Sequence, residues 1–335
     1  MKVTELPQGL ASSIGSLPHT DPRAAAAFIL ERQPRLPAAP SLPRRSGMER
    51  MIAQAAYGIA GLRVLPDGSL EIDDPHLDPR APLSGAGIEG EPFVGLRAFL
   101  AAAAGRRGPI KLQLTGPVTL GVALLNLGVG ADLAFAVAGS AVRARARSLI
   151  AAAQETAPMA PLVVFLDEPG LTAAMHPNFP LDPGRTIDLV SSALATIEPH
   201  AVTGLHCCGV ADWRVVLQAG PQILSLPIES GAPLHGGAIG AFLESGGRIA
   251  WGVVPTNGPL GSTPARLWQH LSAEWCALTQ AGCDPVLLRD HALVTPACGL
   301  GLHGEAQAEL VLSLTGQVAR RLETQAQGMR LTVGA

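Results

Sequence analysis

Lysine, aromatic residues and clustered positive charge are scarce in this sequence of 335 residues. Only Lys2 and Lys111 are lysines among the 24 basic residues, aromatic residues make up 4%, and the formal net charge is −3. No run of basic residues is longer than a pair such as Arg44-Arg45. This gives no electrostatic support for binding to nucleic acid or to a membrane surface. We therefore expect neither kind of partner.

Long apolar runs are missing as well. The most hydrophobic stretch, 120–138, contains Asn126, Asp132 and three glycines, whereas a membrane span needs about 20 mostly apolar residues. It predicts two buried helices instead. The first residues show no apolar segment typical of a signal peptide, and five cysteines in a chain of this length do not resemble a disulfide scaffold. These features predict a cytoplasmic protein, in which clustered cysteine and histidine indicate metal binding or catalysis.

What the sequence has in abundance is apolar residues, at 47%, arranged in short runs that alternate with longer runs of helical spacing. Such alternation predicts a parallel sheet covered by helices on its faces. The expected strands are 10–14, 110–114, 162–166, 201–206, 222–226, 248–253 and 292–295. The expected helices are 92–104, 131–156, 184–197, 236–245, 264–281 and 303–325. Seven or eight such units favour a (β/α)8 TIM barrel, with a doubly wound open sheet as the alternative.

The segment 34–91 departs from this alternation. It is rich in proline, glycine and aspartate, which predicts a loop-rich insertion with one helix at 47–57 and a hairpin near 62–72. No internal repeat and no linker divides the rest of the chain. We therefore expect a single barrel domain over residues 1–335 with this insertion.

Polar residues interrupt the carboxyl ends of three expected strands. One strand ends in His206 and Cys208, the next in Glu229, and the last is followed by Cys298. In a barrel these strand ends meet on the face where catalytic groups gather. One imidazole, two thiols and a carboxylate form a ligand set that suits zinc.

For each cysteine, the alternative to metal binding is an ordinary packed thiol. His206 and Cys208 are two residues apart and share one side of an extended strand, so Cys207 should point away and pack in the core. Cys276 and Cys283 are expected to be packed thiols in a helical stretch. An H-x-C pair alone is more often a buried strand end than a ligand pair. Cys298 and Glu229 at equivalent positions favour the metal site.

Two further strand ends carry polar residues. Asp167 and Glu168 follow five apolar residues, and burying a carboxylate there without a partner would be costly, so it should face a polar cleft. The alternative is a capping role at the next helix. Ser16 ends the first strand in a similar way, and Gly15 before it allows close approach of the backbone to a ligand. An ordinary turn serine is the alternative for Ser16.

Six segments in this order resemble the cobalamin-independent methionine synthase family: "SIGSLPHT", "KLQLTGPVTL", "FLDEPG", "GLHCCG", "LPIES" and "TPACGLG". The resemblance is to the family's carboxy-terminal catalytic barrel and runs from about residue 9 to about residue 325. The wider superfamily includes uroporphyrinogen decarboxylase and methylcobamide:coenzyme M methyltransferases. The resemblance implies a TIM barrel and a zinc-dependent transfer of a methyl group to the thiol of homocysteine, forming methionine.

The resemblance also implies roles for individual residues. The family's zinc ligands match His206, Cys208, Glu229 and Cys298. Its homocysteine-binding groups match Gly15 and Ser16, while Asp167, the candidate catalytic residue, would hold the substrate amino group. A second carboxylate of the family has no matching motif here, and Glu49 is a possible substitute.

The methyl donor implied by the resemblance is a methylcorrinoid or its carrier protein. Full-length members bind methyltetrahydrofolate polyglutamate with the help of a second barrel that this chain is too short to contain. Three alternatives stay open. A coenzyme M-type thiol methyltransferase would not need Asp167. A metal-free uroporphyrinogen decarboxylase-like enzyme would use arginines such as Arg23. A non-catalytic zinc-binding barrel would have its site closed by four protein ligands.

Overall fold

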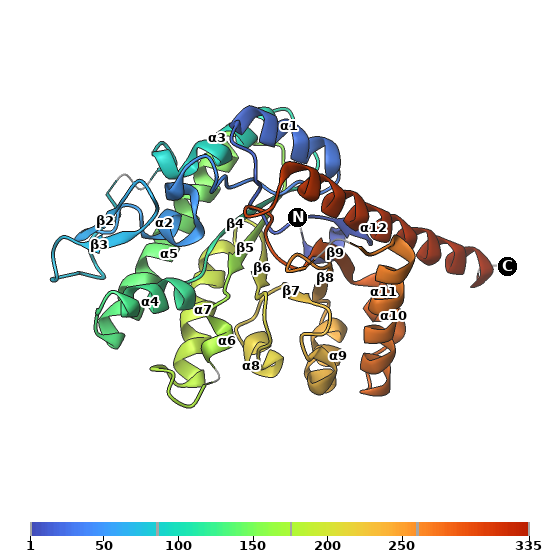
Figure 1. Ribbon diagram of the computed structural model, residues 1–335. Coiled ribbons are helices and arrows are strands. Elements are labelled where there is room, and N and C mark those ends of the chain that lie inside the picture. The colour runs from blue at the N-terminus through green and yellow to red at the C-terminus, as the bar shows by residue number, and fades with distance from the viewer. Residues whose placement is uncertain (1, 85–86, 175, 259–260, 334–335) are drawn as a thin grey trace.

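A computed structural model of the chain describes residues 2–84, 87–174, 176–258 and 261–333. Its centre is a parallel sheet of seven strands in the order β1-β9-β8-β7-β6-β5-β4. Strands β4 to β9 follow one another in chain order, and the first strand lies beside the last, so the sheet curls into a half-barrel (Figure 1). A doubly wound sheet reverses its strand order, so that alternative is wrong. The fold is therefore α/β, as predicted.

All seven strands expected from the sequence are present, with ends shifted by a few residues at most. Most of their residues are buried, which matches a sheet that is covered on both faces. The bounds are β1 Leu10–Ala11, β4 Ile110–Thr115, β5 Leu162–Asp167, β6 Val202–His206, β7 Ile223–Pro227, β8 Arg248–Val254 and β9 Ala292–Pro296.

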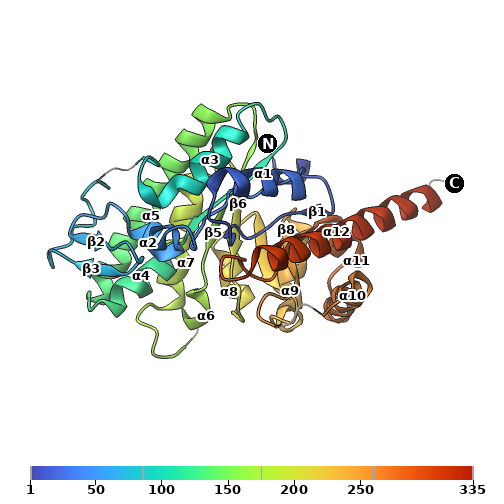
Figure 2. The ribbon, with the colours of Figure 1, turned by 45° about the horizontal axis from the view of Figure 1, so that its top comes forward.

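Helices cover the outer face of the sheet, and α12 extends well past its end (Figures 1 and 2). Many of them begin with proline at the first position behind a capping Asp or Thr, as at Asp21, Asp182 and Thr263. Such a cap bonds free amide groups, and proline fits where no amide is needed. The α-helices are α1 Pro22–Arg32, α2 Met51–Ala56, α3 Val94–Ala102, α4 Pro117–Asn126, α5 Ala131–Thr156, α6 Leu171–Ala174, α7 Pro183–Ile197, α8 Trp213–Gln218, α9 Gly236–Glu244, α10 Pro264–Gln280, α11 Pro285–Asp290 and α12 Glu305–Val333. Short 3-10 helices are η1 Val3–Glu5, η2 Gly47–Glu49, η3 Glu91–Phe93 and η4 Ala232–His235.

The segment predicted to be an insertion contains the expected helix and hairpin. Helix α2 lies within the predicted range, and β2 (Leu62–Val64) pairs with β3 (Leu70–Ile72) as an antiparallel hairpin. The hairpin projects from the side of the molecule beside α2 (Figure 1). The two buried helices predicted for the most hydrophobic stretch are α4 and the start of α5.

The first residues of that segment are part of the sheet region, which the sequence did not predict. Residues 36–42 lie between β4 and the chain that follows β1. Ala38 forms a parallel bridge with Lys111 of β4, and Ser41 forms one with Ser16. This short stretch thus connects the two edges of the half-barrel.

Two apolar clusters result from the alternation of side chains along the strands. A large cluster joins the outer face of the sheet to the helices. A small cluster fills the inside of the curl, and it consists of Leu6, Leu10, Leu36, Val163, Phe165, Val202, Ile223, Ala250 and Leu293. The side chains farther along the same inner faces are polar. They include Gln113, Asp167, His206, Ser225 and Thr295. The carboxyl ends of the strands therefore open onto a polar region.

Over the residues that the structure describes, no helix is both long enough and apolar enough to cross a membrane.

Candidate metal centre

Three of the predicted ligands come together at the carboxyl ends of β6 and β9. His206 is the last residue of β6, Cys208 follows two residues later, and Cys298 lies two residues after β9. One potential ligand atom from each lies within 4.8 Å of the others. All five cysteines are free thiols, which confirms that they do not form a disulfide framework. An imidazole and two thiols at this spacing could hold a metal ion.

The imidazole of His206 is oriented by the next strand. Its Nδ1 lies 3.0 Å from the hydroxyl oxygen of Ser225, its neighbour in the β6–β7 register. The ring is 3% exposed, and its Nε2 is buried with no hydrogen-bond partner among the described residues. A buried nitrogen without a partner is costly. A metal ion bound at Nε2 would remove that cost, so the site fits the metal that the sequence predicted.

The thiols of Cys208 and Cys298 interact directly, and their pKa values shift in opposite directions. The hydrogen bond between them lowers the pKa of Cys208 and raises the pKa of Cys298 to about 12; the side chain of His206 opposes the rise at Cys298, and burial adds to it. Two adjacent thiols cannot both ionise easily, because the second negative charge meets the first. Both residues are partly exposed. A cation between them would favour two thiolates and would be reachable from solvent.

The remaining cysteines lie outside this group. Cys207 points into the outer core, as predicted: it is fully buried, and burial raises the pKa of its thiol to about 11. Cys283 is buried in the predicted way, and its thiol donates to the carbonyl of Gly236. Cys276 is exposed, so its prediction as a packed thiol is wrong. It lies on the outer side of α10.

Glu229 is not brought into the group. It lies in an exposed turn just after β7 with a φ of 65°, in the left-handed region where non-glycine residues are uncommon. The position after the strand was predicted correctly, but the turn directs this residue to solvent. The structure therefore joins three of the four predicted ligands.

Asp167 lies next to the three-residue group. It is the last residue of β5, and it is the register neighbour of His206. Its Oδ1 is buried and has no hydrogen-bond partner among the described residues. Burial raises the pKa of this carboxyl, while the positive charge of Lys111 and the imidazole of His206 act in the opposite direction. A carboxylate in this position can accept a hydrogen bond from a bound cation.

Glu168, the neighbouring carboxylate, caps a helix. It is fully buried and accepts hydrogen bonds from the backbone amides of Val118 and Thr119 at the start of α4, at 2.8 and 2.7 Å. Burial raises its pKa to about 7 despite these bonds. Glu168 thus caps a helix, but this helix is α4, which precedes β5, and not the next helix that the sequence suggested. The carboxylate that keeps a buried oxygen without a partner is Asp167.

Ser16 and Gly15 lie against the loop that carries Cys298. The Ser16 hydroxyl accepts a hydrogen bond from the amide of Gly301 at 3.2 Å, and its carbonyl accepts one from the amide of Leu300 at 3.0 Å. Gly15 has a φ of 146°, and a Cβ there would lie 2.3 Å from Nε2 of Gln113. Glycine is therefore required at this turn. Ser16 therefore lies beside the loop that follows β9, although β1 already ends at Ala11.

Glu49 serves the fold. It is fully buried in η2, and its two oxygens accept hydrogen bonds from the amide of Leu42 at 2.8 Å and from Nε of Arg45 at 2.6 Å. Burial raises its pKa, whereas Arg45 opposes that shift. Both oxygens are engaged, so the structure favours a structural role over the amine-binding role suggested for Glu49.

Sequence reasoning missed two residues beside this site. Ser225 orients His206, and Lys111 is a fully buried cation whose charge acts on Asp167. A serine inside an apolar strand gives only a weak signal. Lys111 gives a stronger one, because a lysine in the middle of "IKLQL" must be buried at a strand position.

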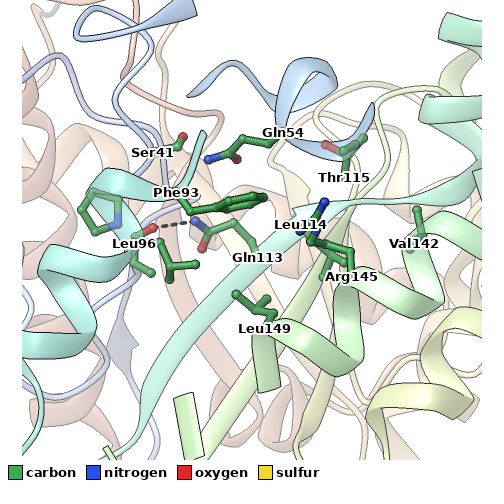
Figure 3. A pocket seen from close by; sticks show the side chains of 13 residues that line it. Ser41, Gln54, Phe93, Leu96, Gln113, Leu114, Thr115, Val142, Arg145 and Leu149 are labelled. Atoms are coloured by element: carbon green, nitrogen blue, oxygen red, sulfur yellow. Dashed lines mark hydrogen bonds between the residues drawn. The ribbon is translucent and has the colours of Figure 1, made fainter. Parts of the chain in front are cut away.

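A cavity lies to the side of this site, where α2, β4 and α5 converge. Gln54, Gln113 and Arg145 point toward it from these elements, with Phe93 among them (Figure 3). The space open to the centre of a water molecule is about 30 Å³, which is room for about two waters. The Gln113 side chain donates to the carbonyl of Ala39 at 2.6 Å and so holds the seam of the half-barrel (Figure 3).

The fold is shared with known methyl-transfer proteins. No protein-family model and no curated protein matches the sequence. Among solved structures, the chain is similar to a methyltransferase from Methanosarcina mazei, with 17% identity over 91% of this chain and 86% of that one and a TM-score of 0.54. It is also similar to a candidate vitamin-B12-independent methionine synthase from Listeria monocytogenes, with 13% identity over 95% and 99% of the two chains and a TM-score of 0.59. Likeness at these identities establishes the fold, and it extends over nearly the whole chain.

Proposed function

We propose that this chain is a zinc-dependent methyltransferase that methylates the thiol of homocysteine to form methionine, with a methylcorrinoid as donor. The observation that carries the proposal is the group of His206, Cys208 and Cys298, in which the buried Nε2 of the histidine has no partner. The fold likeness to a methyltransferase and to a candidate methionine synthase supports the same conclusion. We further propose that residues 36–42 serve as the eighth strand of a complete (β/α)8 barrel, which would form a single domain.

His206, Cys208 and Cys298 would hold the metal. Structural zinc sites are closed by four protein ligands, whereas catalytic sites keep one position open, and a group of three fits the catalytic kind. When bound, zinc would lower the pKa of an acceptor thiol, which is ordinarily about 8.5, and so supply a thiolate nucleophile at neutral pH. Glu229 is outside the group, which leaves the fourth position for the acceptor.

The amino-acid end of homocysteine would be held by Asp167 and Ser16. The unpartnered Oδ1 of Asp167 can accept a hydrogen bond from the substrate ammonium. Ser16, fixed against the loop after β9, places its hydroxyl and the backbone of Gly15 on the other side of the site. The small apolar cluster inside the curl of the sheet, which includes Phe165, excludes water from the inner side of the site. These residues bind and orient the acceptor.

A large donor is compatible with the surface around the site. The thiols of Cys208 and Cys298 are partly exposed. Exposed apolar side chains lie on the loops after β6, β7 and β9, where Val210, Leu234 and Leu302 are 65%, 86% and 87% exposed. Exposed apolar residues beside an active site favour docking of a partner. They support a methylcorrinoid carried on a protein.

The test is methyl transfer from methylcobalamin to L-homocysteine by zinc-loaded protein, with methionine as the measured product. We expect turnover with homocysteine and little with 2-mercaptoethanesulfonate, which lacks the amino group. Asp167→Asn should lower the use of homocysteine about tenfold to a hundredfold at unchanged zinc content, since a hydrogen bond to a charged group contributes about 1.5–3 kcal/mol. Equal use of both thiols would instead favour the coenzyme M-type methyltransferase. If the protein binds zinc but transfers no methyl group, the remaining alternative is a non-catalytic zinc-binding barrel.

A further inference from the structure

Lys111 is a buried cation inside the half-barrel that the proposed chemistry does not use. It is 2% exposed as the second residue of β4, where its neighbours Ile110 and Leu112 point to the outer core. Its own side chain points inward, and Nζ lies 4.6 Å from the centre of the Phe165 ring. A lysine is almost never buried so completely without a specific role.

The ammonium group of Lys111 holds the backbone that leads to the acceptor site. Nζ donates to the carbonyl of Ile14 at 2.8 Å and to Oε1 of Gln113 at 3.3 Å. Gln113 in turn packs against Gly15, where no side chain would fit. The next residue is Ser16. Lys111 and Gln113 thus fix the turn that presents Ser16 to the site.

The same charge acts on Asp167. Burial lowers the pKa of Lys111 to about 8, and the negative charge of Asp167 opposes that shift. Among the described residues Lys111 donates to a carbonyl and an amide oxygen but to no carboxylate. Phe165, two residues before Asp167 on β5, lies beneath the ammonium. Asp167 is therefore under the influence of a positive charge, while its Oδ1 stays free to accept a ligand.

We propose that Lys111 is a positioning residue for the amino-acid end of the acceptor, acting through the Ile14–Ser16 backbone and through Asp167. It does not contact the thiol or the metal ligands. The inference rests on the proposed function for the identity of the acceptor. It predicts that Lys111 determines the affinity for an amino-acid thiol and leaves both metal binding and the reacting thiol unaffected.

The experiment compares wild type, Lys111→Met, Asp167→Asn and the double variant, all loaded with zinc. Binding of L-homocysteine and of 2-mercaptoethanesulfonate is measured by calorimetry, which does not depend on turnover. We expect Lys111→Met to raise the Kd for homocysteine about tenfold, the loss typical of a charge-assisted interaction. The Kd for 2-mercaptoethanesulfonate should change less than threefold. In methyl transfer, KM for homocysteine should rise while kcat at saturation stays within twofold.

The double variant separates a specific effect from general damage. If Lys111 acts partly through Asp167, the two losses are coupled, and the double variant should lose clearly less than the product of the single losses. Arg248→Met is the matched control. Arg248 is another buried cation of the sheet, 5% exposed at the amino end of β8. Its replacement should leave the ratio of the two Kd values unchanged.

The outcomes distinguish this inference from the proposed function. An unchanged Kd for homocysteine in Lys111→Met, or an equal loss for both thiols, would overturn the role of Lys111. Independent losses in the double variant would overturn its action through Asp167. Tight binding of homocysteine without methylation would refute the proposed reaction but leave the role of Lys111 intact. Failure of the wild type to bind homocysteine would refute both.

Discussion

His206 and Ser225 face each other on neighbouring strands, with the histidine Nδ1 3.0 Å from the serine hydroxyl oxygen. A metal ion bound at Nε2 requires that the proton of the neutral ring lie on Nδ1, which would then donate to the serine. Ser225 therefore orients the ring, and its hydroxyl can accept a hydrogen bond from Nδ1 in the tautomer that a metal needs. With Nδ1 engaged by the serine, Nε2 is the nitrogen left to bind a metal ion together with the two thiols.

Ser225→Ala should weaken metal binding without abolishing it. The histidine would keep its place on β6 but lose the bond that orients it, and loss of such a supporting bond costs about tenfold to a hundredfold in metal affinity. Zinc affinity is measured by competition with a chromophoric chelator. An affinity equal to that of wild type would show that the ring is held by packing alone.

Cys208→Ser and Cys298→Ser should each remove most of the zinc from the purified protein. A serine hydroxyl stays protonated at neutral pH, so it cannot replace a thiolate ligand. Elemental analysis after dialysis gives the stoichiometry, and we expect one zinc per chain in the wild type. Full occupancy in both variants would place the metal elsewhere.

Two controls belong to this measurement. Cys207→Ser changes the adjacent thiol, which is buried in the outer core, and should keep its zinc. Glu229→Gln changes the exposed carboxylate after β7, which the structure leaves outside the group, and should keep its zinc too. Loss of zinc in Glu229→Gln would mean that the turn swings in when the metal binds and that the four-ligand prediction was correct.

The sequence predicted the arrangement of the strands and most of the metal group for one physical reason. Parallel strands end at the same edge, so polar residues that end apolar runs, such as His206 and Cys298, must lie close together. The alternation along β6 also separated Cys208 from Cys207 correctly. These predictions did not depend on the conformations of the loops.

What the sequence did not predict depends on backbone details at single positions. Glu229 follows the right strand, but a left-handed φ turns it to solvent. Glu49 was suggested as a substitute for a family carboxylate that has no matching motif here, and its ion pair with Arg45 became visible only in the fold. Residues 36–42 resemble a proline-rich loop in sequence, yet they hydrogen-bond to β4. The contacts of residues 36–42 with β4 join segments that lie far apart in the chain, whereas Arg45 and Glu49 are only four residues apart.

Glu49→Gln should lower the stability and leave catalysis unchanged. The amide cannot satisfy both Arg45 and the Leu42 amide, so a buried group loses its partner, at a cost of about 1–3 kcal/mol. The free energy of unfolding from urea titration measures the loss. KM for homocysteine should match the wild type under conditions in which the variant is folded. A rise in KM without loss of stability would restore the amine-binding role of Glu49.

The buried charge of Lys111 should make the stability depend on pH in a way that Lys111→Met abolishes. Burial lowers the pKa of Lys111 in the folded protein to about 8, from the ordinary lysine value of 10.5.

Below pH 8 the lysine is charged in both states, and the folded state bears the full cost of burying it. Between about pH 8 and pH 10.5 the folded state has released the proton that the unfolded state still binds, so stability rises with pH. The wild type should therefore gain on the order of 3 kcal/mol relative to Lys111→Met across this interval, because each pKa unit corresponds to about 1.4 kcal/mol. At pH 7 the variant should be the more stable protein, despite losing the bond to the Ile14 carbonyl. The difference in the free energy of unfolding is measured by urea titration at pH 7, 8, 9 and 10, and the titrating groups that do not interact with Lys111 cancel between the two proteins. A difference that is independent of pH would show that Lys111 is neutral or solvated in the folded state. A gain in stability combined with a loss of homocysteine binding would mark Lys111 as a residue kept for binding and not for folding.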